Sequence, residues 1–310
     1  MQKLEPAAVA QIADAMDRAE ALIKAGRSGP AVQAFALARA LSVNLPPAGT
    51  IAAIVARNEK VFRTERERHR SAIAARRPTG RGLVIFADSL GLPRPVARGA
   101  EPLEDRVYAE LIADAATDRA MTSICQRYFT TSHILQELEA DPQLAAGADV
   151  IIHVGLNDCV NRMFLEDERL SLDLLPEELK TRVVTFSNRH RRAILTDLAS
   201  RHYVSPEKFS ANLDAILVLL KQRKAQRVVL TTIILPPISA WPSTPFINRN
   251  FADYNMRIMS AARNHSALLF DLDRHIWRAQ HEGALLSDGM HLASEGHRIF
   301  AREAMALLPV

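Results

Sequence analysis

The stretch Leu83-Val-Ile-Phe-Ala-Asp-Ser-Leu-Gly91 joins a short apolar run to a polar turn. Similar apolar runs recur along the chain, separated by stretches with helical periodicity, at residues 121–125, 150–154, 227–235 and 267–271. Strands that are apolar along their whole length are buried on both faces, which is typical of a parallel sheet between two layers of helices. The sequence therefore predicts an α/β fold with a five-stranded parallel sheet.

Polar residues follow three of these runs. Ser89 comes directly after the first run and Asn157 after the third, while Asp288 and His291 follow the fifth run and a helical stretch. In parallel α/β sheets, ligands bind at the carboxyl ends of the strands. We therefore expect these four side chains to meet at one edge of the sheet.

These residue types suit acyl transfer through a serine. A serine hydroxyl needs an adjacent base, for which His291 is the candidate, and Asp288 can fold back to fix the tautomer of that imidazole. The oxyanion of the tetrahedral intermediate needs N–H donors, which the Ser89 backbone and the Asn157 side chain could supply. The alternatives are a surface or capping histidine, a serine at a helix N-cap and an Asx turn at Asn157.

Three blocks around these residues resemble the motifs of the SGNH (GDSL-type) hydrolases: Ala87-Asp88-Ser89-Leu90, Gly155-Leu156-Asn157-Asp158 and Asp288-Gly289-Met290-His291. The resemblance covers residues 81–308, and three blocks in order are more specific than any one of them. It implies a flavodoxin-like three-layer α/β/α fold, with Ser89 as nucleophile, His291 as base, Asp288 as its partner and Asn157 as an oxyanion donor. Asp158 is interpreted as structural, and no metal or organic cofactor is implied.

Two positions depart from the family pattern. Ala87 replaces the glycine of the first block. The glycine of the second block, an oxyanion donor through its N–H group, has no counterpart in residues 126–133, where Thr131 or Thr130 could supply an N–H group instead. Positive φ is costly for a β-branched residue. An altered oxyanion hole is therefore one expectation.

The chain outside this core is predicted to be helical. Residues 1–78 have helical periodicity and resemble in part a tetratricopeptide repeat, but no second copy follows, so an ordinary helical hairpin is preferred. Residues 81–310 are expected to form the hydrolase-like domain, with a helical insertion at about 160–204. Arg189 and Arg192 in this insertion belong either to a solvated helix face or to a lid that contacts an acidic substrate.

Composition narrows the class of protein. The 310 residues are 48% hydrophobic and 24% charged, which suffices for a sizeable core, and a dispersed net charge of +4 does not favour nucleic acid as a partner. The sequence shows neither a secretory signal nor an apolar run that could span a membrane, so a cytoplasmic protein is expected. Cys125 and Cys159 have no disulfide or zinc spacing, and each is expected to be a small buried hydrophobe.

The substrate class depends on the resemblance alone. The preferred interpretation is a serine hydrolase that acts on an O-acylated carbohydrate or a related small ester through an acyl–Ser89 intermediate. An O-acyltransferase with the same residues is one alternative, and a non-catalytic sugar-binding or scaffold protein is another. The N-terminal helices could bind a protein partner or a second copy of the chain.

Overall fold

The computed structural model describes residues 4–76, 79–93, 106–198, 201–279 and 283–308. These residues form two compact units, which we describe separately. Unit 1 comprises residues 1–61, 161–203 and 242–246, and unit 2 comprises residues 62–160, 204–241 and 247–310. Of the helices described, none combines the length and the apolar character that a transmembrane span requires.

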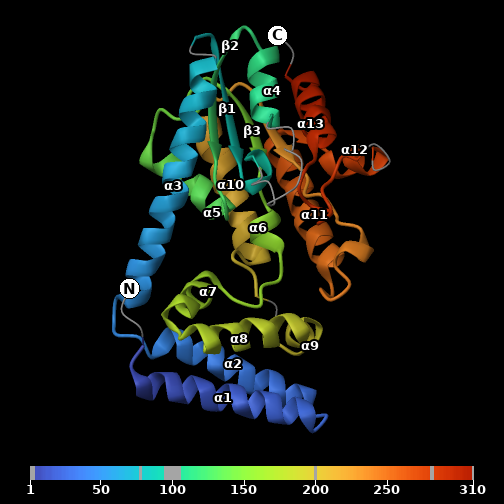
Figure 1. Ribbon diagram of the computed structural model, residues 1–310. Coiled ribbons are helices and arrows are strands. Elements are labelled where there is room, and N and C mark those ends of the chain that lie inside the picture. The colour runs from blue at the N-terminus through green and yellow to red at the C-terminus, as the bar shows by residue number, and fades with distance from the viewer. Residues whose placement is uncertain (1–3, 77–78, 94–105, 199–200, 280–282, 309–310) are drawn as a thin grey trace. The chain divides into compact units, whose positions relative to one another are not determined.

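Unit 2 contains a five-stranded parallel sheet, as predicted (Figure 1). Its strands are β1 (Arg81–Ala87), β2 (Arg119–Cys125), β3 (Asp149–His153), β4 (Val228–Thr231) and β5 (Leu268–Phe270), in the order β2-β1-β3-β4-β5. After β1 the chain adds β2 on one side and β3 on the other. The crevice outside the carboxyl ends of β1 and β3 is therefore the topological switch point, where ligands bind in sheets of this kind.

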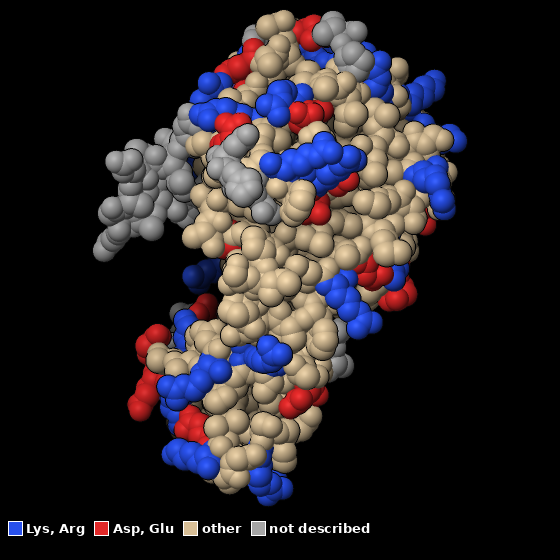
Figure 2. Space-filling view, turned by 90° about the vertical axis from the view of Figure 1, so that its right-hand side faces the viewer, with Lys and Arg blue, Asp and Glu red and all other residues tan. Residues whose placement is uncertain are grey.

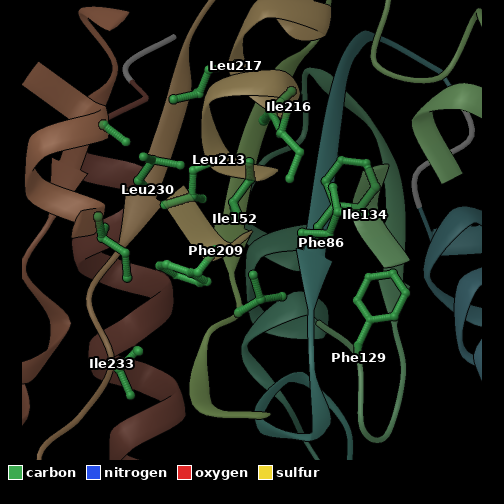
Figure 3. Packing of buried hydrophobic residues seen from close by; sticks show 14 of the residues in the cluster. Phe86, Phe129, Ile134, Ile152, Phe209, Leu213, Ile216, Leu217, Leu230 and Ile233 are labelled. Atoms are coloured by element: carbon green, nitrogen blue, oxygen red, sulfur yellow. The ribbon is translucent and has the colours of Figure 1, made fainter. Parts of the chain in front are cut away.

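Helices cover both faces of the sheet, which confirms the three-layer α/β/α prediction. One face packs against α5 (Thr131–Ala140), α10 (Pro206–Gln222) and α11 (Ile247–His265). The other packs against α4 (Tyr108–Ala115), α12 (Leu272–Arg278) and α13 (Ser294–Ala306). Figure 3 shows the first of these cores, in which Phe86 and Ile152 of the sheet lie close to Ile216 of α10.

A buried ion pair lies at the opposite end of the sheet from the switch point. Arg119, at the start of β2, pairs with Asp149, at the start of β3, and both side chains are fully buried. Arg81 donates to the same carboxylate at 2.9 Å, and Arg119 also donates to the carbonyl of Leu308 at 3.0 Å. A buried charge needs such partners because its desolvation is costly. These contacts join the amino ends of the three strands.

β4 is shorter than predicted. It ends at Thr231 rather than at Leu235, because Asn255 of α11 replaces the neighbouring strand as a hydrogen-bond partner. The Asn255 side chain accepts from the N–H group of Ile233 at 2.7 Å and donates to the carbonyl of the same residue at 2.8 Å. Cys125 and Cys159 are both buried, as predicted.

Unit 1 is helical. It contains α1 (Pro6–Lys24), α2 (Ser28–Asn44), the first part of α3 (Thr50–Arg76), α7 (Glu166–Ser171), the short 3-10 helix η2 (Leu172–Leu174), α8 (Glu177–Arg189) and α9 (Arg191–Asp197). The sequence predicted that the insertion at about 160–204 belongs to the hydrolase-like domain. In the structure, residues 161–203 belong to unit 1 instead, because their apolar face shares a core with α1 and α2. Phe186 of α8 stacks on Phe35 of α2, with ring centroids 5.3 Å apart.

The predicted boundary at residues 78–81 also differs from the structure. The second part of α3, from Phe62, belongs to unit 2, where Ile73 is buried in the core beside the sheet. On the face shown in Figure 2, Lys and Arg side chains are interspersed with Asp and Glu rather than gathered in one basic stripe. This distribution agrees with the dispersed charge of the sequence.

Candidate active site

Ser89 lies in the turn that follows β1. It begins the short 3-10 helix η1 (Ser89–Gly91), and the Asp88 carboxylate accepts from the N–H group of Leu90 at 2.8 Å. The N–H group of Asp88 donates to the carbonyl of His153, at the end of β3, at 3.3 Å. The alternative interpretation of Ser89 was a helix N-cap, but the N-cap residue of η1 is Asp88. The turn places Ser89 at the switch point between β1 and β3.

The structure brings Ser89, His291 and Asp288 together. The Ser89 Oγ lies 3.3 Å from the His291 Nε2, and the His291 Nδ1 lies 2.6 Å from the Asp288 Oδ2. If Nδ1 carries the proton that the carboxylate accepts, Nε2 is left as an acceptor facing the serine hydroxyl. This is the arrangement that a serine nucleophile with a histidine base requires.

Asp288 is held as a carboxylate by several donors. Its Oδ1 accepts from the backbone N–H groups of Met290 and His291, each at 3.0 Å, and its Oδ2 accepts from the His291 ring. Burial by itself would raise the pKa of Asp288, but these hydrogen bonds outweigh burial and lower the pKa well below its ordinary value. Asp288 is therefore ionised at neutral pH and suited to orient an imidazole.

The loop that carries Asp288 and His291 is fixed by backbone contacts. The N–H group of Leu286 donates to the carbonyl of His291 at 2.8 Å, and the indole N–H of Trp241 donates to the carbonyl of Asp288 at 2.7 Å. Sequence reasoning did not identify Trp241, because no motif surrounds it and its partner is distant along the chain. Only the folded loop after β4 brings the indole to this position.

Gly289 allows this loop to turn and to approach its neighbours. Its φ is +69°, and a Cβ atom there would lie 2.8 Å from the Pro237 Cδ and 3.1 Å from the Ala240 Cβ. We expect Gly289→Ala to strain the backbone and to displace the Asp288–His291 turn, lowering kcat and reducing the free energy of unfolding by about 1–3 kcal/mol. Thermal unfolding and steady-state kinetics measure the two effects.

Gly283→Ala is the matched control for that variant. Gly283 has the same φ of +69°, but a Cβ atom there would have no neighbour within 4 Å. Backbone strain alone would therefore lower stability in both variants, whereas the displacement of the loop would lower kcat only in Gly289→Ala. Equal kcat values for the two variants would show that the close approach at Gly289 does not position the loop.

Asn157 and Asp158 follow β3 in the short helix α6 (Leu156–Cys159). Asn157 is 7% exposed, and its Nδ2 donates to the carbonyl of Phe129 at 3.3 Å. Asp158 is buried and accepts from the N–H group of Thr131 at 3.0 Å and from its hydroxyl at 2.6 Å. Asp158 therefore connects α6 to the start of α5, in agreement with its interpretation as a structural residue.

The loop after β2 differs from the expected oxyanion geometry. The left-handed residue there is Tyr128, with φ +60°, whereas Thr130 is extended and Thr131 begins α5. The N–H group of Thr130 donates to the His133 Nδ1 at 3.1 Å, and that of Thr131 donates to Asp158. Either threonine would bind an oxyanion only after its N–H group had left this partner.

A cavity of about 410 Å³ lies beside the Asp288–His291 loop. It is lined by residues from the segment after β4 and from the loop itself: Pro237, Ser239, Ala240, Leu285, Leu286, Ser287 and Gly289. None of these lining residues is charged, and Ser239 and Ser287 supply hydroxyl groups. Such a lining suits a neutral polar group.

Arg189 and Arg192 belong to unit 1, whereas Ser89, Asp288 and His291 belong to unit 2. Arg189, the last residue of α8, borders a cavity of about 350 Å³ that also contacts Lys24 of α1. Contact of these arginines with a substrate stays a prediction. In the described part of the chain, no three His, Cys, Asp or Glu side chains are grouped so as to hold a metal ion.

Comparison with known proteins points to one family. The model of the GDSL-like lipase/acylhydrolase family matches residues 87–299. The solved structures that match include a lipase/acylhydrolase from Enterococcus faecalis, with 17% identity over 74% of this chain and 95% of that chain and a TM-score of 0.50. Axe2, an acetylxylan esterase from Geobacillus stearothermophilus, has 14% identity over 75% of this chain and 95% of that chain, with a TM-score of 0.50.

LAE5, an alpha/beta hydrolase from the metagenome of Lake Arreo, has 18% identity over 74% of this chain and 94% of that chain, with a TM-score of 0.50. At these identities the solved structures establish the fold alone. No curated protein matches the chain. The family match spans all three sequence blocks, from Ala87 to beyond His291.

Proposed function

Because the chain belongs to the GDSL-like lipase/acylhydrolase family, and is a carboxylic ester hydrolase of the SGNH type, we propose that it cleaves its substrate through a covalent acyl–Ser89 intermediate. The observation that carries this proposal is the continuous row of contacts from the Ser89 Oγ through the His291 ring to the Asp288 carboxylate. Each member of the row has the partner that its chemical role requires.

The proposed reaction has two halves. In the first, His291 Nε2 takes the proton of Ser89 as its Oγ attacks the ester carbonyl, and then returns that proton to the leaving alcohol as the C–O bond breaks. In the second, His291 Nε2 takes a proton from water as the water oxygen attacks the acyl carbonyl. The bond between the acyl carbon and the Ser89 Oγ then breaks, His291 returns the proton to Oγ, and the acid is released. Asp288 stays ionised throughout and stabilises the imidazolium.

The oxyanion is proposed to be stabilised by the N–H group of Ser89 and by the Asn157 side chain. Asn157 lies in α6, directly after β3, and its Nδ2 donates to the Phe129 carbonyl at 3.3 Å. Exchanging that acceptor for an oxyanion would strengthen the hydrogen bond, because a charged acceptor binds more strongly than a neutral one. A donor of this kind typically contributes about 2.7–4 kcal/mol to lowering the barrier.

For the substrate, we propose an O-acylated neutral carbohydrate. Among the residues that the structure describes, those lining the cavity beside the Asp288–His291 loop are uncharged and include two serine hydroxyls, which suits the hydroxyl groups of a sugar. One structural relative is an acetylxylan esterase. The alternative is an acidic sugar ester held by Arg189 and Arg192.

A substrate panel tests this choice. Acetate release would be measured from acetylated xylo-oligosaccharides, from an acetylated uronic acid oligomer and from p-nitrophenyl acetate. We expect kcat/KM for the neutral oligosaccharide to exceed that for the acidic one at least ten-fold. A preference for the acidic oligomer that disappears in the double variant Arg189→Gln/Arg192→Gln would favour the alternative, an acidic sugar ester that these two arginines hold.

The same assay separates hydrolysis from transfer. Acceptor sugars would be added and the products analysed by mass spectrometry, because an acyltransferase passes the acyl group of Ser89 to a sugar hydroxyl rather than to water. We expect free acetate as the main product. A dominant acylated sugar would identify a transferase, and sugar binding with neither product would identify a binding protein.

A further inference from the structure

A buried cluster of aromatic and imidazole rings contacts the Ser89 turn and takes no part in the proposed reaction. It contains Tyr108 of α4, His153 at the end of β3, and His297 and Phe300 of α13. The Tyr108 Oη lies 3.0 Å from the His153 Nδ1, and the Tyr108 ring stacks on Phe300 with centroids 3.8 Å apart. Tyr108 is fully buried and His153 is 2% exposed.

Tyr108 is held at its backbone as well as at its hydroxyl. Its N–H group donates to the His297 Nδ1 at 3.3 Å, so two imidazoles fix the two ends of one residue. Burial lowers the pKa of His153 to about 3, with a further lowering from His297. Burial, and then His291, lower the pKa of His297 to about 4. Both rings are therefore neutral near pH 7 and contribute hydrogen bonds rather than charge.

The Tyr108–His153 pair contacts both ends of the turn that carries Ser89. At one end, the His153 carbonyl accepts from the N–H group of Asp88 at 3.3 Å. At the other, a Cβ atom on Gly91 would lie 2.7 Å from the Tyr108 Oη and 2.8 Å from the Cys125 Sγ. The hydroxyl of Tyr108 therefore packs against Gly91 with no room for a larger residue.

We propose that Tyr108 and His153 are positioning residues that hold the Asp88–Gly91 turn so that the Ser89 Oγ faces His291. This inference rests on the proposed function, because it takes Ser89 to be the nucleophile. Their hydrogen bond is buried and joins α4 to the end of β3, so it fixes the position of the turn from two separate elements. Small displacements of a reacting group lower the rate of the chemical step steeply.

The test compares two tyrosines that each lose one buried hydroxyl. In Tyr108→Phe we expect kcat to fall about ten-fold with KM changed less than two-fold, because the chemical step is affected and binding is not. Tyr254→Phe is the matched control: its hydroxyl donates to the carbonyl of Val204 at 2.6 Å, and Tyr254 packs in the core on the other face of the sheet. We expect it to lower Tm while leaving kcat unchanged.

A double-mutant cycle tests whether the two residues act together. If the hydrogen bond carries the effect, Tyr108→Phe and His153→Leu combined will lower kcat no further than the more severe single variant. The shape of the pH profile of kcat should be the same in these variants as in wild type, since neither His153 nor His297 titrates near neutral pH. His153→Asn, whose amide can still form a hydrogen bond with the Tyr108 hydroxyl, should retain more activity than His153→Leu. If Tyr108→Phe does not fold, the comparison of these two His153 variants replaces the comparison of the two tyrosine variants.

The rate at which a fluorophosphonate labels Ser89 provides a second readout that needs no substrate. We expect labelling to slow in Tyr108→Phe in proportion to kcat and to stay unchanged in Tyr254→Phe. Equal labelling rates and kcat values in wild type, Tyr108→Phe and Tyr254→Phe would overturn the positioning role. Failure of the wild-type protein to react would instead contradict the proposed function.

Discussion

Replacing Ser89 by alanine is expected to lower kcat for ester hydrolysis by about 10⁴-fold or more, because the proposed acyl intermediate forms on the Ser89 hydroxyl. Within the described part of the chain, the hydrogen bond of the Ser89 hydroxyl is the 3.3 Å contact with the His291 Nε2, so its removal should leave Tm almost unchanged. The combination of lost activity and retained fold is the signature of a nucleophile. Steady-state kinetics with p-nitrophenyl acetate, together with thermal unfolding, measure both quantities.

Ser260→Ala is a suitable control for this experiment. Ser260 is exposed on α11, where its hydroxyl donates to the carbonyl of Met256 at 2.8 Å, and it should keep wild-type kinetics. Mass spectrometry after brief reaction with a fluorophosphonate should find the label on Ser89 in wild type and on no residue in Ser89→Ala. Wild-type turnover by Ser89→Ala would mean that the ester is cleaved elsewhere in the protein.

Asp288→Asn is expected to lower kcat by roughly 10³–10⁴-fold. The carboxylate accepts the proton of His291 Nδ1, and an amide placed there would donate its NH2 group instead. Nε2 would then carry the proton, and the imidazole could no longer accept from Ser89. Because Asp288 does not touch the substrate in the proposed reaction, KM should change much less than kcat. A variant with normal kcat would exclude Asp288 as the orienting residue.

The lowered pKa of Asp288 also predicts how its contribution to stability varies with pH. A carboxyl group whose pKa is lower in the folded protein stabilises the fold above its unfolded pKa of about 3.9, and this stabilisation is lost as the pH falls towards the folded value. The difference in Tm between wild type and Asp288→Asn should therefore be largest near pH 7 and shrink below about pH 4. Asp253→Asn, which removes a carboxylate that pairs with Arg257 at a half-buried position on α11, controls for general acid effects. A difference in Tm that does not vary with pH would contradict the assigned hydrogen bonds.

The strands, and the residues Ser89, His291 and Asp288, could be predicted because the sequence patterns that indicate them are local. Each strand is a short continuous apolar run, since both faces of a parallel sheet are covered by helices. Ser89 and Asn157 each follow such a run directly, and Asp288 and His291 are three residues apart on one loop. The rule that ligands bind at carboxyl strand ends then placed them at one edge.

The division of the chain into units was less predictable. Residues 160–204 interrupt the hydrolase-like sequence, and nothing in their own pattern shows that their apolar face is shared with α1 and α2. Similarly, α3 is one continuous helix, yet its two parts belong to different units. Helical periodicity identifies the buried face of a helix but not the element that buries it.

The sequence alone thus determined the parallel sheet, the order of its strands along the chain and the residue types at their carboxyl ends, because these depend on spacing between near neighbours. Only the tertiary structure decided that the N–H group of Thr131 donates to Asp158, that Trp241 holds the carbonyl of Asp288 and that Tyr108 packs beneath the Ser89 turn. Each of these contacts joins residues far apart in the chain, and their partners are set by the packing of whole elements. Local patterns carry no information on such pairings.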